Sequence, residues 1–222
     1  METVSTRERI GARAVPATVR TVRRALLLLT VVLLAAGCGS SAAKVVEMQP
    51  PAKRTFAGGE LTPPRTAPPL SLHDASGRQF TLSGQRGRYS LVTFIYTHCP
   101  DVCPLITSNL NTVLRTLGPK ANVEVLAVSV DPKGDTPAAV HAYEKAKHLE
   151  PAFHYLIGTR AQLRQVWAAW HVLAVDQKPD VVDHVAYTAL VDPTGKERVL
   201  YDAQVNAQQV LHDLRLLKTQ RA

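Results

Sequence analysis

The chain from residue 70 onward alternates between apolar runs and amphipathic segments. Residues 89–96 and 122–130 are almost continuously apolar, aromatic or β-branched, which predicts two strands buried on both faces. We predict further strands over 154–157, 185–191 and 198–201, helices over 106–117, 137–148, 160–170 and 206–217, and an N-terminal hairpin from 70–72 and 79–82. Strands that alternate with helices and end in a hairpin predict an α/β fold, with a mixed central β-sheet flanked by helices.

The predicted order of elements fits a thioredoxin-like fold with an N-terminal β-hairpin, which we place in residues 70–222. Residues 38–69 differ in texture, because they are rich in glycine, serine and proline and poor in bulky apolar residues. Such a composition cannot bury enough surface to fold alone, so we expect a flexible tether there.

The first 37 residues do not suit the fold and predict an export signal. They carry arginines and then the apolar run 25–36, which is shorter than the roughly 20 residues that a spanning helix needs. The run ends in small residues before Cys38, a pattern that resembles the lipobox of bacterial lipoproteins. We therefore expect a lipid anchor on Cys38, loss of residues 1–37, and a protein on the extracytoplasmic face of the bacterial cell membrane. The alternative is an uncleaved, marginal membrane anchor.

The charge of the chain argues against a nucleic-acid partner. The whole chain has a formal net charge of +8. Residues 1–37 hold six arginines and two glutamates, so removing them leaves only +4. A mild excess that is spread along the chain does not indicate nucleic-acid binding.

Cys99 and Cys103 lie between a predicted buried strand and a predicted helix. Their spacing predicts two sulfurs on one helix face, and a helix N-terminus favours the thiolate by lowering its pKa. The pair could be a structural disulfide, a redox couple or a metal site. A bridge over so short a loop restricts the unfolded chain little, which favours chemistry over a structural role. The three intervening residues also leave room for an ion between the sulfurs.

The candidate for a third ligand is His184, which immediately precedes the strand predicted over 185–191. In a thioredoxin-like sheet the loop before that strand packs beside the cysteine helix, and Asp183 or Asp180 could orient the imidazole. Two thiolates and one imidazole suit copper as Cu(I) and Cu(II). Asp101 could tune the site or contact an acceptor, or simply be a solvated loop carboxylate. The other histidines are better explained by loop, surface or structural roles, with His98 a secondary ligand candidate: His73, His98, His141, His148, His154, His171 and His212.

Three blocks of the sequence closely resemble the Sco/SenC family, over about residues 68–218. The first is the run Phe-Ile-Tyr-Thr-His-Cys-Pro-Asp-Val-Cys-Pro at 94–104. The second is Ser-Val-Asp-Pro at 129–132 with Asp-Thr-Pro at 135–137, and the third is Asp-His at 183–184 with Asp-Pro-Thr-Gly at 192–195. The resemblance implies a thioredoxin-like fold and a copper site formed by Cys99, Cys103 and His184. It also implies a role in assembling the binuclear copper centre of cytochrome c oxidase subunit II.

Two functions follow as expectations. The first is a copper metallochaperone that delivers copper to subunit II, held at the membrane by its lipid anchor and supplied by a copper donor. The second is a thiol–disulfide reductase, in which Cys99 and Cys103 form a redox-active disulfide while keeping the acceptor cysteines reduced, with a thiol reductant protein as partner. A peroxidase is a weaker third interpretation.

Overall fold

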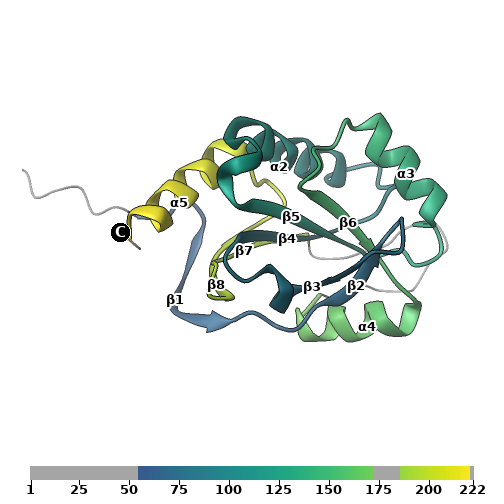
Figure 1. Cartoon of the computed structure of the whole chain (residues 1–222), viewed down its shortest axis with the longest axis horizontal. Coiled ribbons are helices and arrows are strands. Elements are labelled where there is room, and N and C mark those ends of the chain that lie inside the picture. Colours follow the sequence, from purple (N-terminus) through teal and green to yellow (C-terminus); the bar gives the residue numbers. More distant parts are fainter. Residues whose placement is uncertain (1–54, 173–185, 221–222) are drawn as a thin grey trace, which may run out of the picture. The chain divides into compact units, whose positions relative to one another are not determined.

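The structure, a computed structural model, describes residues 55–172 and 186–220 (Figure 1). In that part of the chain, eight strands form one sheet in the order β1-β8-β7-β4-β5-β6-β2-β3. The strands are β1 (Gly59–Thr66), β2 (Ser71–Asp74), β3 (Gln79–Thr81), β4 (Tyr89–Ile95), β5 (Val123–Ser129), β6 (Phe153–Ile157), β7 (Thr188–Val191) and β8 (Lys196–Tyr201). The α-helices are α2 (Cys103–Leu117), α3 (Pro137–Ala146), α4 (Arg160–Ala169) and α5 (Ala207–Thr219), and short 3₁₀ helices follow β3 and α2.

The centre of the sheet is parallel and its flanks are antiparallel. β4 pairs in parallel with β5, and β5 with β6, whereas β7 runs antiparallel to β4. All residues of β4 and β5 are buried, as their apolar runs predict. The predicted mixed sheet flanked by helices is therefore confirmed.

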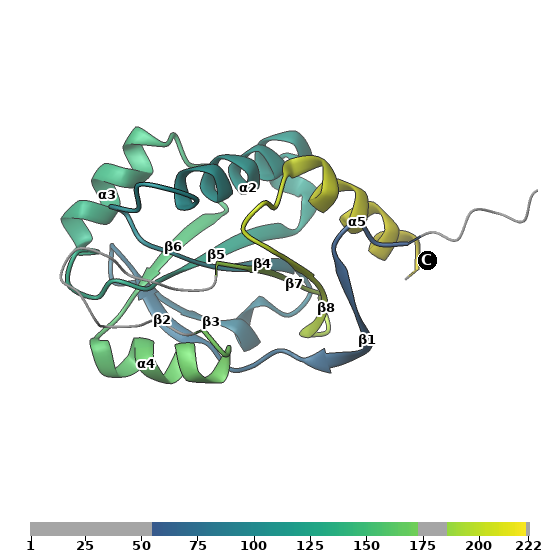
Figure 2. The same ribbon diagram turned by 180° about the vertical axis from the view of Figure 1, so that it is seen from behind.

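Helices cover the sheet on both faces (Figures 1 and 2). α4 lies on one face, and α2, α3 and α5 lie on the other. Local sequence fixes where they begin: Thr136 caps α3 directly before a proline, and α4 and α5 each start with a capping box. Within residues 55–172 and 186–220, no helix combines the length and apolar character required to cross a bilayer.

The prediction that residues 38–69 form a tether is wrong for residues 59–66. These residues form β1, which pairs with β8 at one margin of the sheet and is held by an ion pair between Arg65 and Glu197. Asp213 on α5 also accepts hydrogen bonds from the backbone N–H groups of Ala57 and Gly58, at 2.8 and 3.0 Å. β1 is almost wholly exposed and carries prolines, which edge strands tolerate, so it lacks the alternation that marks a strand in sequence. The predictions for residues 1–37 and for Cys38 lie outside the described residues.

The strand directions bring three chain segments to one end of the sheet, which we call the site end. β4 and β5 are parallel, so the loops that leave them, residues 96–102 and 130–136, start side by side. β7 is antiparallel to β4, with Thr188 opposite Thr93 near the end of β4. The chain therefore enters β7 at the same site end.

Candidate dithiol metal site

Both cysteines lie at the site end, one on each side of a helix start. Cys103 is the first residue of α2 and is 0% exposed, whereas Cys99 is half-buried in the loop that leaves β4. Both are free thiols, and they hydrogen-bond to each other. The prediction that the two sulfurs share a helix face is wrong, because the helix begins only at Cys103. They meet instead because the loop folds back, with the Cys99 N–H donating to the Tyr96 carbonyl at 3.3 Å.

The environment of Cys103 opposes the thiolate in the metal-free protein. Burial raises the pKa of the Cys103 thiol, and the hydrogen bond with Cys99 raises it further. The backbone N–H of Tyr96 bonds to this thiol and lowers its pKa, but burial dominates. The expected lowering by the helix N-terminus is therefore wrong for Cys103. A bound cation would reverse this balance, because a thiol that coordinates a metal ion is deprotonated and its proton is released to solvent.

Asp135 fastens the cysteine loop to the neighbouring strand. Its carboxylate is 4% exposed, and its Oδ1 accepts from the backbone N–H of Thr97 at 2.9 Å and from the Thr97 hydroxyl at 2.7 Å. Its Oδ2 accepts from the hydroxyls of Ser129 at 2.6 Å and Tyr155 at 2.9 Å. Four donors from three segments thus converge on one buried carboxylate, and two of the four belong to Thr97, which stands two residues before Cys99.

The sequence alone did not reveal this role of Asp135. Thr136, the next residue, caps α3 through its side chain, which accepts from the Ala139 N–H, so the carboxylate of Asp135 is not used as the cap. The available signal was positional, because Asp135 follows β5 and the cysteine loop follows β4, the parallel neighbour. Such neighbours meet at the same end of a sheet.

The other predicted site residues have different outcomes. His98 is exposed, and its Nδ1 lies 2.9 Å from the Thr97 hydroxyl, which fits a loop residue. Asp101 is exposed in the cysteine loop. His184, Asp183 and Asp180 lie outside the described residues. Within residues 55–172 and 186–220, no group of three or more histidine, cysteine or acidic residues is placed to hold a metal ion.

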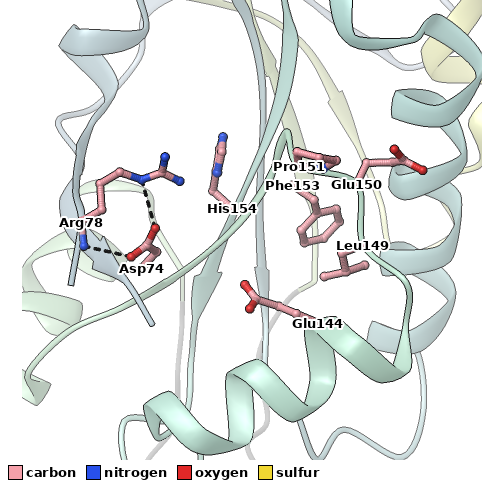
Figure 3. Close-up of a pocket in the computed structure, with 8 residues that line it drawn as sticks. All are labelled: Asp74, Arg78, Glu144, Leu149, Glu150, Pro151, Phe153 and His154. Carbon is pink, nitrogen blue, oxygen red and sulfur yellow. Dashed lines mark hydrogen bonds and ion pairs between the residues drawn. The ribbon is translucent and has the colours of Figure 1, made fainter. Parts of the chain in front are cut away.

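Two hollows lie away from the thiols, near the start of β6, and Figure 3 shows one of them. Both are lined by Glu150, Pro151 and His154, and the one in Figure 3 also contains the ion pair of Arg78 with Asp74. Burial lowers the pKa of His154 to about 4, so its imidazole is neutral near pH 7. Its ring packs on Phe80 with centroids 4.4 Å apart, which confirms a structural role.

A mixed sheet flanked by helices, with a reduced dithiol at a strand-to-helix junction, defines a thioredoxin-like protein with a candidate metal or redox site. The SCO1/SenC family model matches residues 59–219. The chain therefore belongs to the SCO1/SenC family.

Relatives and solved structures agree with this assignment. A SCO2-like protein of Rickettsia typhi is 28% identical over 153 residues, which cover 66% of this chain and 74% of that protein. Apo Sco1 from Thermus thermophilus is 33% identical with a TM-score of 0.63, covering 75% of this chain and 99% of that one. Bradyrhizobium japonicum ScoI, solved with copper bound, is 31% identical with a TM-score of 0.59, covering 68% of this chain and 98% of that one. The thioredoxin-like fold is thereby confirmed.

Proposed function

We propose that this protein is a copper metallochaperone that supplies copper to the binuclear centre of cytochrome c oxidase subunit II. The observation that carries the proposal is a pair of free thiols that hydrogen-bond to each other at the site end of the sheet, one buried and one reachable from solvent. Family membership and the copper-bound relative from Bradyrhizobium japonicum support copper as the cargo. Soft thiolates are suited to Cu(I).

His184 is the third ligand in this proposal. It stands two residues before Ala186 in the sequence, where the description of the chain resumes. Ala186 and Tyr187 lead into β7 at the site end, where the Tyr187 carbonyl accepts from the Thr93 hydroxyl at 3.2 Å. An imidazole beside two thiolates makes a site that suits both copper oxidation states. Asp183 would then be placed to orient the ring.

Three ligands suit transfer better than storage. A structural zinc site is closed by four ligands, whereas an open position lets an acceptor's ligand bind before the donor's ligands leave. The solvent-reachable thiol of Cys99 is the ligand that an acceptor approaches first. Copper then passes between proteins without being released as a free ion.

The unequal exposure of the two thiols also favours a second function, that of a thiol–disulfide reductase. The Cys99 thiolate would attack an acceptor disulfide, forming a mixed disulfide and releasing one acceptor thiolate. The Cys103 thiolate would then displace the second acceptor thiolate, leaving a Cys99–Cys103 disulfide and a reduced acceptor. A thiol reductant protein must restore the pair, so this function needs a second partner.

The cellular placement is part of the proposal and rests on the sequence of residues 1–38. An export signal followed by a lipid anchor on Cys38 would hold the folded domain at the extracytoplasmic face of the cell membrane. That is the side on which an exported copper chaperone would meet a membrane-bound acceptor. Metabolic labelling with a radioactive or clickable fatty acid tests the anchor, since Cys38→Ala would abolish incorporation.

Copper titration of the reduced protein tests the main proposal, read by thiolate-to-copper charge-transfer absorption. We expect His184→Ala to weaken copper binding by more than about a hundredfold, because even loss of an outer-shell partner costs 10–100-fold. Exchange of the dithiol with a small disulfide should persist. The matched control is His141→Ala, an exposed histidine on α3 that pairs with Glu144 and should bind copper as the wild type does. Wild-type protein that gives no charge-transfer band would refute the chaperone, and oxidase assembly that survives His184→Ala would favour the reductase.

A further inference from the structure

We infer that an apolar surface around Cys99 is the docking site for the protein that accepts the copper. This surface, the collar, is formed by Pro100, Val102, Pro104 and Leu105, all at least partly exposed. The partner it fits is a protein whose own metal ligands sit on an uncharged, apolar surface. The inference rests on the proposed function and names the face that the acceptor uses.

Leu105 is the residue that distinguishes this surface. It is 62% exposed and is the only large apolar side chain exposed to that extent in residues 55–172 and 186–220. The solvent-facing stripe of α2 runs on from Leu105 at helical spacing, and its other members are polar: Ser108, Thr112, Arg115 and Thr116. The single apolar position therefore lies at the end of the stripe next to the cysteines.

The collar offers a partner apolar contact and few hydrogen bonds. Pro100 and Pro104 have no backbone N–H. The N–H groups of Leu105 and Ile106 both donate to the Val102 carbonyl, each at 3.0 Å. Asp101 supplies the one formal charge within residues 99–105. Residues 99–105 thus offer a partner more apolar surface to bury than charges to pair.

The chemistry of copper transfer indicates that the acceptor protein is what covers the collar. During exchange an acceptor ligand and the Cys99 sulfur bind the same ion, and with metal–sulfur bonds of about 2.3 Å the two ligand atoms lie within about 5 Å. Cys103 is 0% exposed, so the approach is through Cys99. An acceptor that comes so close must cover the residues flanking Cys99 in sequence. The collar, whose residues adjoin Cys99 and Cys103 in sequence, is therefore the surface that we expect this contact to cover.

The test compares Leu105→Glu with Thr112→Glu, a matched control on the same stripe two turns further along α2. The probe is the soluble copper domain of oxidase subunit II from the same organism, titrated calorimetrically with the reduced, metal-free full chain. We expect Leu105→Glu to raise the dissociation constant at least about tenfold, equivalent to about 1.4 kcal/mol. Thr112→Glu and the apolar variant Leu105→Met should stay within about twofold of the wild type, in keeping with unchanged apolar contact.

Copper titration of the same variants separates this inference from the proposed function. Leu105→Glu should bind copper as the wild type does, since its defect lies in docking. Equal affinities of Leu105→Glu and Thr112→Glu for the acceptor domain would overturn the inference, even if copper binding were intact. So would a change confined to self-association in sedimentation or to retention on phospholipid vesicles, because the collar would then serve a second copy or the bilayer. A wild type that docks normally but binds no copper would refute the chaperone and leave the docking face supported.

Discussion

Replacing Asp135 by alanine removes the carboxylate that fastens the cysteine loop to β5. Four donors lose their acceptor: the Thr97 N–H, and the hydroxyls of Thr97, Ser129 and Tyr155. Two of the four have a partial alternative. The Thr97 hydroxyl lies 2.9 Å from His98 Nδ1, and the Tyr155 hydroxyl lies 3.5 Å from the Ile95 carbonyl. The Thr97 N–H and the Ser129 hydroxyl are therefore the two donors that would lose their acceptor without a replacement.

The magnitude follows from those two donors. A buried donor left without an acceptor costs about 1–3 kcal/mol, so two of them cost about 2–6 kcal/mol. Alanine also relieves the burial of a charge, which offsets part of this loss, so we expect about 2–4 kcal/mol of destabilisation. Asparagine keeps one carbonyl oxygen for Thr97 and presents an amide to the two hydroxyls on the other side. We therefore expect Asp135→Asn to lose about half as much.

The loss caused by Asp135→Asn should also depend on pH. Burial raises the pKa of Asp135 above its ordinary value of 3.8, although hydrogen bonds from Ser129, Thr97 and Tyr155 act in the other direction. The folded state then holds the proton more tightly than the unfolded state, so the wild type loses stability as pH rises through the raised pKa. The difference between wild type and Asp135→Asn should accordingly be largest in acid and shrink toward neutral pH.

Urea unfolding of the metal-free protein measures these free energies, with Asp101→Ala as the control. Asp101 is an exposed carboxylate in the same loop, and its removal should change the free energy of unfolding by less than about 0.5 kcal/mol. A readout specific to the site is the rate at which Cys103 is alkylated, which should rise in Asp135→Ala as the loop loosens. If Asp135→Ala unfolded no more easily than Asp101→Ala and left that rate unchanged, the proposed role of Asp135 in holding the cysteine loop would be refuted.

Two further predictions concern protonation and access. His154 has a pKa of about 4 against an ordinary 6.5, so the unfolded state takes up its proton first and stability falls as pH drops through this window. Between about pH 7.5 and pH 5, the wild type should lose about 2 kcal/mol more unfolding free energy than His154→Gln, and parallel urea-unfolding curves would contradict this. In the reduced, metal-free protein, iodoacetamide should label the half-buried Cys99 before the fully buried Cys103, as peptide mapping would show. Equal labelling of both thiols under native conditions would mean that the burial of Cys103 does not protect it.

The strands that could be predicted from the sequence are those whose burial produces a recognisable apolar pattern. β4 and β5 are fully buried, so their sequences are unbroken apolar runs and their positions agree with the prediction to within a residue. β1 is stabilised by an ion pair with Glu197 and by backbone pairing to β8, and the two residues before it hydrogen-bond to Asp213. These interactions depend on residues outside 59–66, so the local pattern of apolar and polar positions did not indicate a strand and predicted a tether instead.

The site divides in the same way. The cysteine pair could be predicted, because its spacing and its place between a strand and a helix are local properties. The conformation of the loop could not, since Cys99 is placed by a turn and by a carboxylate 38 residues beyond Thr97. The thiol chemistry was also misjudged for Cys103, because a helix N-terminus is visible in sequence but the depth of burial is not.

The burial of Cys103 makes its thiol less reactive in the metal-free state, whereas its position at a helix N-terminus would by itself make it more reactive. A thiol is nucleophilic and easily oxidised mainly as the thiolate, so the raised pKa of Cys103 keeps this thiol less reactive in the metal-free protein. A soft cation held by Cys99 and Cys103 would provide the compensating charge and displace the proton, so metal binding and deprotonation would be coupled. The half-buried Cys99 would be the thiol that a metal ion reaches first, while the loop held by Asp135 keeps it beside the buried Cys103. In the proposed chaperone, the cargo itself would convert a protected dithiol into a ligand pair.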